Sequence, residues 1–203
     1  MQIHWHGKSF FSIDMREKKL LIDPFASSEQ KSPRVEAQLV MTDPDAGIDF
    51  GDAFVVCEAG EYEVHEVFTS VLRQKCEKSI GNLIYLFEVE NMSCAHLGAL
   101  SCPISKENLE KIMGVDILFI PVGGKGVLGA KEAAELVNLI EPRVVVPMYF
   151  YAAGLDPDRE PVENFVRALG IAPSPAEDKF KITASQLPAD DRRLVLLNAH
   201  EGK

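Results

Sequence analysis

The first two thirds of the chain consist of short apolar runs separated by polar turns. These runs are rich in Val, Ile, Phe and Tyr, which suit the pleated, half-buried surface of a β-sheet. The pattern predicts strands at residues 2–5, 9–15, 19–22, 37–41, 54–57, 61–72, 82–89 and 92–96. We therefore expect a meander at the start of the chain, followed by further sheet strands.

The pattern changes near residue 105, where helical periodicity begins to alternate with continuous apolar runs. Ser105 is a suitable N-cap for a helix over residues 106–113, and apolar stripes predict helices over 130–140 and 161–169. Apolar runs at 115–121, 143–147 and 193–198 predict strands, the first two covered on both faces. Strands followed by alternating strands and helices predict an α/β (α+β) fold with helices on the outer faces of its sheets.

Composition narrows the class of protein. A chain of 203 residues that is 46% hydrophobic can bury a sizeable core, and we expect one domain over residues 1–203. The net charge of -10 and the lack of a basic stripe disfavour nucleic acid as a partner. The sequence shows neither a basic leader with an apolar segment nor a membrane-length apolar run, so we expect a cytoplasmic protein without a membrane partner. A small molecule, another protein or a second copy of this chain remain open as partners.

Four cysteines occur at Cys57, Cys76, Cys94 and Cys102. They show no C-x-x-C spacing, and each lies in or beside an apolar run, where a reduced cysteine packs as a small hydrophobic residue. We expect four free thiols.

Several short motifs follow one another in a characteristic order. They read HWHGKSFFSI, LLIDPF, GEYEV, AHLGAL, VDILFIPVGG and KEAAELVNLIEPRVVVPMYF. Together they resemble the metallo-β-lactamase-fold hydrolases, and most closely the branch described as Zn-dependent hydrolases of the β-lactamase fold, over about residues 2–150. The resemblance implies a four-layer αββα metallo-β-lactamase-like sandwich with a metal site at one edge, between its two sheets.

The hallmark of that family is a T-H-x-H-x-D-H motif after a strand, and its ligands hold two zinc ions that activate a water molecule. In this chain Thr42 matches the threonine of the motif. Asp43, Asp45, Gly47 and Ile48 occupy the four ligand positions. Glycine and isoleucine side chains offer zinc no donor atom, so a dinuclear site is not expected.

Three further family positions also differ. The family often reads H-L-G-D-L, and here His96 is kept while Ala99 replaces the carboxylate. Tyr149 stands at the histidine of P-M-H-Y, and Lys8 at the histidine of G-H-S. The resemblance thus implies a family member that keeps its frame and lacks the usual metal shell. We expect no conventional dizinc hydrolysis, no cofactor, and a non-catalytic binding module.

The residues also permit other interpretations. Asp43 and Asp45 could form an ordinary turn around Pro44, or they could bind a hard cation such as Mg²⁺, Mn²⁺ or Ca²⁺. Under the second interpretation the chain is a metal-dependent hydrolase, with zinc or another divalent ion held by a non-standard set that includes His96 and Tyr149. His96 could equally be a hydrogen-bonded structural residue, and Asp23 could support the site or only fix the turn before Pro24. Metal-free catalysis would require a perturbed acid and base pair. The candidate pocket residues are Lys8, Asp23, Asp43, Asp45, His96 and Tyr149.

Overall fold

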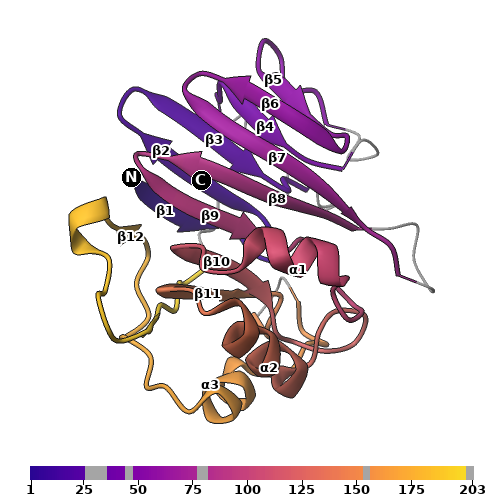
Figure 1. Cartoon of the computed structure of the whole chain (residues 1–203), viewed down its shortest axis with the longest axis vertical. Coiled ribbons are helices and arrows are strands. Elements are labelled where there is room, and N and C mark those ends of the chain that lie inside the picture. The colour runs from indigo at the N-terminus through magenta and orange to yellow at the C-terminus, as the bar shows by residue number, and fades with distance from the viewer. Residues whose placement is uncertain (26–35, 44–47, 77–81, 153–155, 200–203) are drawn as a thin grey trace.

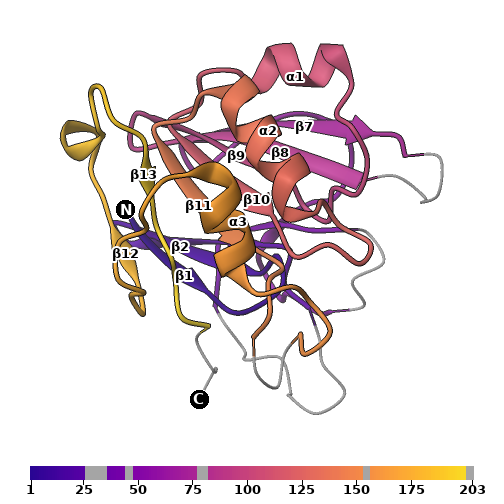
Figure 2. The ribbon, with the colours of Figure 1, turned by 90° about the horizontal axis from the view of Figure 1, so that it is seen from below.

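The computed structural model describes residues 1–25, 36–43, 48–76, 82–152 and 156–199. Its strands form two sheets, and its helices lie along the second of them (Figures 1 and 2). This mixed α/β sandwich confirms the fold class expected from the sequence.

The first sheet has the strand order β12-β1-β2-β3-β4-β5. Strands β1 to β3 form the expected antiparallel meander, and β4 and β5 then add in parallel. The bounds are β1 (Gln2–Trp5), β2 (Phe11–Met15), β3 (Lys18–Ile22), β4 (Leu39–Met41), β5 (Phe54–Val56) and β12 (Phe180–Lys181).

The second sheet has the order β13-β11-β10-β9-β8-β7-β6. Its half from β6 to β9 is antiparallel, and β9, β10, β11 and β13 are parallel. The bounds are β6 (Gly60–Val64), β7 (Val67–Gln74), β8 (Asn82–Val89), β9 (Met92–His96), β10 (Ile117–Pro121), β11 (Val144–Met148) and β13 (Arg193–Leu194). Strands β10 and β11 are buried at every position, as expected for strands covered on both faces.

The helices are α1 (Lys106–Ile112), α2 (Ala130–Ile140), α3 (Val162–Leu169) and the short 3₁₀ helix η1 (Ala184–Gln186). The Ser105 side chain accepts a hydrogen bond from the backbone N–H of Asn108 at 3.2 Å, so Ser105 is the N-cap that the sequence predicts. Helix α2 has the predicted bounds. None of the helices in the described part of the chain is long and apolar enough to cross a membrane.

Alternation along the strands divides the first sheet into two faces. Leu20 and Ile22 point into the main core between the sheets, whereas Leu21 joins a separate cluster on the outer face. That outer cluster contains Phe10, Leu21 and Val40, with Phe25, Ala37, Phe50 and Ala53 packed against it. No described helix contributes to it, so the helical cover belongs to the second sheet.

Two predicted strands are wrong. Of the run at residues 193–198, only Arg193–Leu194 forms a strand, β13. The run at residues 61–72 is two strands, β6 and β7, joined by a hairpin turn in which His65 and Glu66 have φ angles of 53° and 67°. Such a two-residue turn usually contains Asn or Gly, and neither is present here. The turn therefore lacks the sequence signal by which it would be recognised.

The prediction of four free thiols is also wrong. Cys76 and Cys102 form a disulfide, although 26 positions separate them, while Cys57 and Cys94 are free. Cys76 follows β7 and Cys102 precedes α1, so only the folded topology brings the two together.

Candidate functional site

A pocket of about 330 Å³ lies at the edge where strands of both sheets end. The chain leaves β3 at Asp23, β4 at Thr42 and β11 at Tyr149, and all three residues line the pocket. Crevices outside the carboxyl ends of strands are common ligand sites in α/β proteins. The complete lining is Ser9, Asp23, Pro24, Phe25, Thr42, Asp43, Asn82, Leu83, Tyr85, Ala99 and Tyr149.

Three candidate residues have an unusual backbone conformation. Lys8, Asp23 and Tyr149 have φ angles of 49°, 48° and 55°, in the left-handed region that residues with a side chain seldom adopt. The carbonyl of Lys8 accepts hydrogen bonds from Trp5 Nε1 at 3.0 Å and from the N–H of Tyr149 at 3.1 Å. The N–H of Asp23 donates to the carbonyl of Met41 at 2.8 Å. Contacts between separate segments thus hold this strained backbone in place.

The turn after β10 supports Tyr149 from behind. A Cβ atom on Gly123 would lie 1.9 Å from the carbonyl oxygen of Tyr149, so only glycine permits this approach. Arg159 Nη1 donates to the carbonyls of Gly124 and Lys125 at 2.6 and 2.7 Å. The Arg159 guanidinium also lies 5.1 Å from the centre of the Tyr149 ring. The close approach of Gly123 therefore fixes the backbone of Tyr149, and the Arg159 guanidinium packs against the face of its ring.

His96 is completely buried at the end of β9, and the backbone binds both nitrogens of its ring. Nε2 donates to the carbonyl of Ser9 at 2.9 Å, and Nδ1 accepts from the N–H of Gly98 at 3.2 Å. Burial lowers the pKa of His96 to about 4, against the opposing effect of the bond to Ser9. His96 is therefore a neutral imidazole that ties the loop before β2 to the end of β9.

Asp23 is at the centre of a hydrogen-bonded group beneath the pocket. Burial raises the pKa of this carboxyl from its ordinary 3.8 to about 7, although hydrogen bonds from Ser9 and Tyr85 oppose the rise. Burial also raises the pKa of the Tyr85 hydroxyl, and the charge of Asp23 adds to this effect. Ser9 Oγ and Tyr149 Oη form a hydrogen bond of 3.2 Å, which connects the network to the end of β11.

The structure brings together only part of the predicted site. Asp23, Asp43 and Tyr149 line the pocket, with Asp43 exposed at its edge. Lys8 lies beside the pocket, where its Nζ is 4.8 Å from the centre of the Phe25 ring. His96 contacts the pocket network from below, since its Nδ1 is 3.9 Å from Asp23 Oδ2. Asp45 lies outside the described residues.

Sequence reasoning missed several polar groups in the lining. Ser9, Asn82 and Tyr85 each lie in a predicted strand, where a polar or aromatic residue carries no special signal. Their partners are distant in sequence, and Asn82 Nδ2 donates to the carbonyl of Leu97 at 2.7 Å. The one sequence signal for this region was the H-L-G motif at residues 96–98. Its glycine is needed because a side chain on Gly98 would collide with Asn82 and with the carbonyl of Leu83.

The described lining offers oxygen donors and one amide, without an imidazole or thiolate facing the pocket. Across the described ranges, no group of three or more His, Cys, Asp and Glu side chains is arranged to hold a metal ion. Zinc usually binds imidazole, thiolate and carboxylate groups, and of these the described lining offers only the carboxylates of Asp23 and Asp43.

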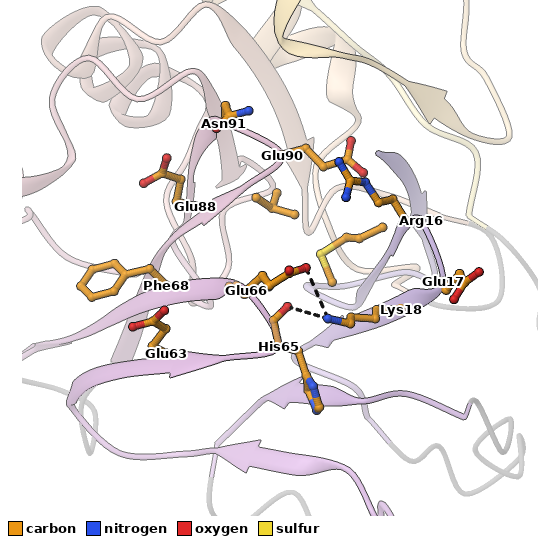
Figure 3. A pocket seen from close by; sticks show the side chains of 13 residues that line it. Arg16, Glu17, Lys18, Glu63, His65, Glu66, Phe68, Glu88, Glu90 and Asn91 are labelled. Atoms are coloured by element: carbon orange, nitrogen blue, oxygen red, sulfur yellow. Dashed lines mark hydrogen bonds and ion pairs between the residues drawn. The ribbon is translucent and has the colours of Figure 1, made fainter.

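A larger cavity of about 630 Å³ lies at the opposite end of β8, where three hairpin turns meet (Figure 3). Five glutamates line it, and Lys18 Nζ lies 3.4 Å from both Glu66 Oε2 and the carbonyl of His65. The positive φ angles here are those of tight hairpin turns. We therefore interpret this cavity as a solvated gap between turns.

Comparison with known proteins agrees with the two-sheet fold. A family model described as the beta-lactamase superfamily domain matches residues 2–149. A protein of Methanopyrus kandleri named a metal-dependent hydrolase is 24% identical over 215 residues, covering 84% of this chain and 94% of that protein. A relative of the same name from Methanosarcina mazei is 25% identical over 224 residues, covering 87% and 97%.

Solved structures extend the comparison. A Thermotoga maritima protein described as a candidate Zn-dependent hydrolase of the metallo-β-lactamase superfamily has a TM-score of 0.80 at 26% identity, covering 97% of this chain and 98% of that one. A metallo hydrolase of Ignicoccus hospitalis shares the fold, with a TM-score of 0.64 at 12% identity and coverage of 98% and 96%. The family match over most of the chain and the shared sandwich show that this chain belongs to the beta-lactamase superfamily domain family, within the metallo-β-lactamase superfamily.

Proposed function

We propose that the pocket at the strand ends binds a small organic molecule directly and that the chain is not a conventional dizinc hydrolase. The main support is His96, whose two ring nitrogens are both hydrogen-bonded to backbone groups. Neither nitrogen offers a lone pair to the pocket, so His96 has a structural role and connects backbone segments.

The donor set of the described residues does not fit a dinuclear zinc centre. Such a centre needs several imidazoles, thiolates or carboxylates converging at about 2.0 to 2.3 Å from each ion. Here Ala99 has no donor, Tyr149 presents a phenol, and Asp23 is held by Ser9 and Tyr85. The carboxyl of Asp23 is therefore already engaged by protein donors.

The same lining suits direct binding of a polar ligand. Small-molecule sites combine apolar walls with a few fixed polar groups. Phe25 and Leu83 supply apolar surface, while Thr42, Asn82 and Tyr149 supply hydroxyl and amide groups. Tyr149 lies on a left-handed turn, Thr42 donates its N–H to the carbonyl of Val56, and Asn82 donates to the carbonyl of Leu97, so these groups are held before any ligand arrives.

A second candidate is a metal-dependent hydrolase that uses a non-standard ligand set around Asp43, Asp45, His96 and Tyr149. One observation favours it, because Asp43 and Tyr149 line the same pocket as Asp23, and oxygen donors suit a hard cation. The engaged nitrogens of His96 weigh against it.

Elemental analysis separates the two candidates. The full chain, purified without chelators, is incubated with zinc or manganese, desalted and measured for metal per chain. We expect much less than one metal per chain. Stoichiometric metal that is lost in an Asp43→Ala, Asp45→Ala double variant but kept in the matched Asp49→Ala, Asp52→Ala variant would overturn the proposal.

Ligand-observed NMR with a panel of small polar metabolites tests direct binding. Ala99 is exposed at the pocket, so Ala99→Trp should block the site without disturbing the core. Binding that is abolished by Ala99→Trp supports the proposal.

A further inference from the structure

The disulfide between Cys76 and Cys102 joins two segments that border the pocket wall. Cys76 lies two residues after the end of β7, and Cys102 lies in the segment between β9 and α1. Their Cα atoms are 5.7 Å apart, within the normal span of a disulfide, and both residues are half-buried. A small thiol therefore has access to the sulfur atoms.

Non-covalent contacts join the same two segments independently of the disulfide. The buried Gln74 side chain accepts hydrogen bonds from the N–H of Ser105 and from Asn108 Nδ2, both at 3.0 Å. Its amide also donates to the carbonyls of Lys75 and Pro103, at 3.0 and 3.3 Å. Because this polar group remains when the disulfide opens, reduction should be a local event that leaves the fold intact.

The covalent ring closed by the disulfide contains one whole side of the pocket. Strands β8 and β9 lie between the two cysteines in the chain, and with them Asn82, Leu83, Tyr85 and Ala99. Asn82 binds the carbonyl of Leu97 and packs against Gly98, so the start of β8 and the end of β9 move together. Opening the ring therefore removes the covalent restraint between the two segments that flank this wall.

The remaining cysteines differ from this pair. Cys94 is completely buried, and burial raises the pKa of its thiol, which makes it a poor nucleophile. Cys57 is half-buried and unbridged. Both therefore serve as internal controls for a redox reaction at the other two.

We propose that Cys76–Cys102 is a redox modification site at which a low-molecular-weight thiol opens the disulfide and loosens the β8–β9 wall of the pocket. The thiolate of one small molecule attacks a cysteine sulfur, forming a mixed disulfide and releasing the other cysteine as a thiolate, which takes a proton. A second small thiol attacks the mixed disulfide and releases the second cysteine. The small thiols leave as their own disulfide, and the protein gains two electrons and two protons.

The test uses the full chain equilibrated with reduced and oxidised glutathione at a series of ratios. Alkylation with iodoacetamide followed by intact mass measurement should show two thiols appearing together as the ratio rises. Hydrogen exchange measured on peptides spanning residues 82–86 and 96–101 should become about tenfold faster in the reduced protein, because the disulfide no longer limits how far the joined segments separate when this wall opens locally.

Two variants make the result specific. The Cys76→Ser, Cys102→Ser protein should exchange like the reduced wild type and ignore glutathione, whereas Cys57→Ser, Cys94→Ser should respond as the wild type does. Failure to form the disulfide in excess oxidised glutathione would overturn the proposal. So would equal exchange of these peptides in the oxidised and reduced proteins, or exchange that also accelerates throughout α2 and β11.

Discussion

Replacement of Asp23 by asparagine should change how the stability of the protein depends on pH. The carboxyl of Asp23 has a pKa of about 7 in the folded protein and an ordinary value of 3.8 when unfolded. Between these values the folded state binds the extra proton, so the stabilisation is fully present below pH 3.8 and is lost as pH rises toward 7. One pKa unit corresponds to about 1.36 kcal/mol, so the wild type should lose about 3 kcal/mol relative to Asp23→Asn between pH 4 and pH 7.

The assay is urea unfolding of both proteins at pH 4, 5.5 and 7, followed by the fluorescence of the single tryptophan. Trp5 is only 2% exposed and packs against Phe150, so its emission should report loss of the core. Taking the difference between wild type and variant removes the titration of all groups that they share. An unchanged difference in unfolding free energy across this pH range would refute the reasoning.

His96 provides a control of opposite sign. Its pKa is about 4 in the folded protein and 6.5 ordinarily, so its stabilisation is present above pH 6.5 and is lost as pH falls toward 4. Relative to a His96→Gln variant, the wild type should lose about 3 kcal/mol between pH 7 and pH 4. Glutamine is chosen because its amide can still donate to the carbonyl of Ser9.

Three further changes test other parts of the structure. Gly123→Ala should lower the free energy of unfolding by about 2 kcal/mol or more in urea titrations, because the new methyl group meets the carbonyl of Tyr149; stability equal to wild type would contradict the close approach. Phe165→Ala should lower it by about 3 to 5 kcal/mol by leaving a cavity under α3, whereas the exposed Leu139→Ala on α2 should change it by less than about 1 kcal/mol. Glu107→Gln should leave the melting temperature unchanged, since the ion pair of Glu107 with Lys111 is exposed and screened; a clear drop in that temperature would show that the pair matters.

Local patterns predicted much of the fold. The apolar stripe over residues 130–140 predicted both ends of α2, and the apolar runs at residues 2–5 and 19–22 predicted β1 and β3 to within one residue. The turn at His65 was missed because the backbone adopts its hairpin geometry without the usual Asn or Gly. There the pairing of β6 with β7 in the sheet outweighs local preference.

The site was less predictable, because its chemistry depends on contacts between distant segments. The motif comparison identified Asp23 and Tyr149 as pocket residues, but it contains no information on the partners of a ring nitrogen or on burial. The neutral state of His96 and the raised pKa of Asp23 follow from packing that joins residues dozens of positions apart. The disulfide was missed for the same reason.

The left-handed turns at Lys8, Asp23 and Tyr149 have a consequence for dynamics and for the history of the site. They belong to loops, yet bonds to neighbouring segments hold them, so this rim should be as rigid as the sheets that it joins. The hydrogen bonds that hold these turns are made by backbone carbonyl and N–H groups, which are present whatever side chain the position carries. The protein can therefore exchange the chemistry displayed at its pocket one residue at a time, while the architecture that presents it stays the same.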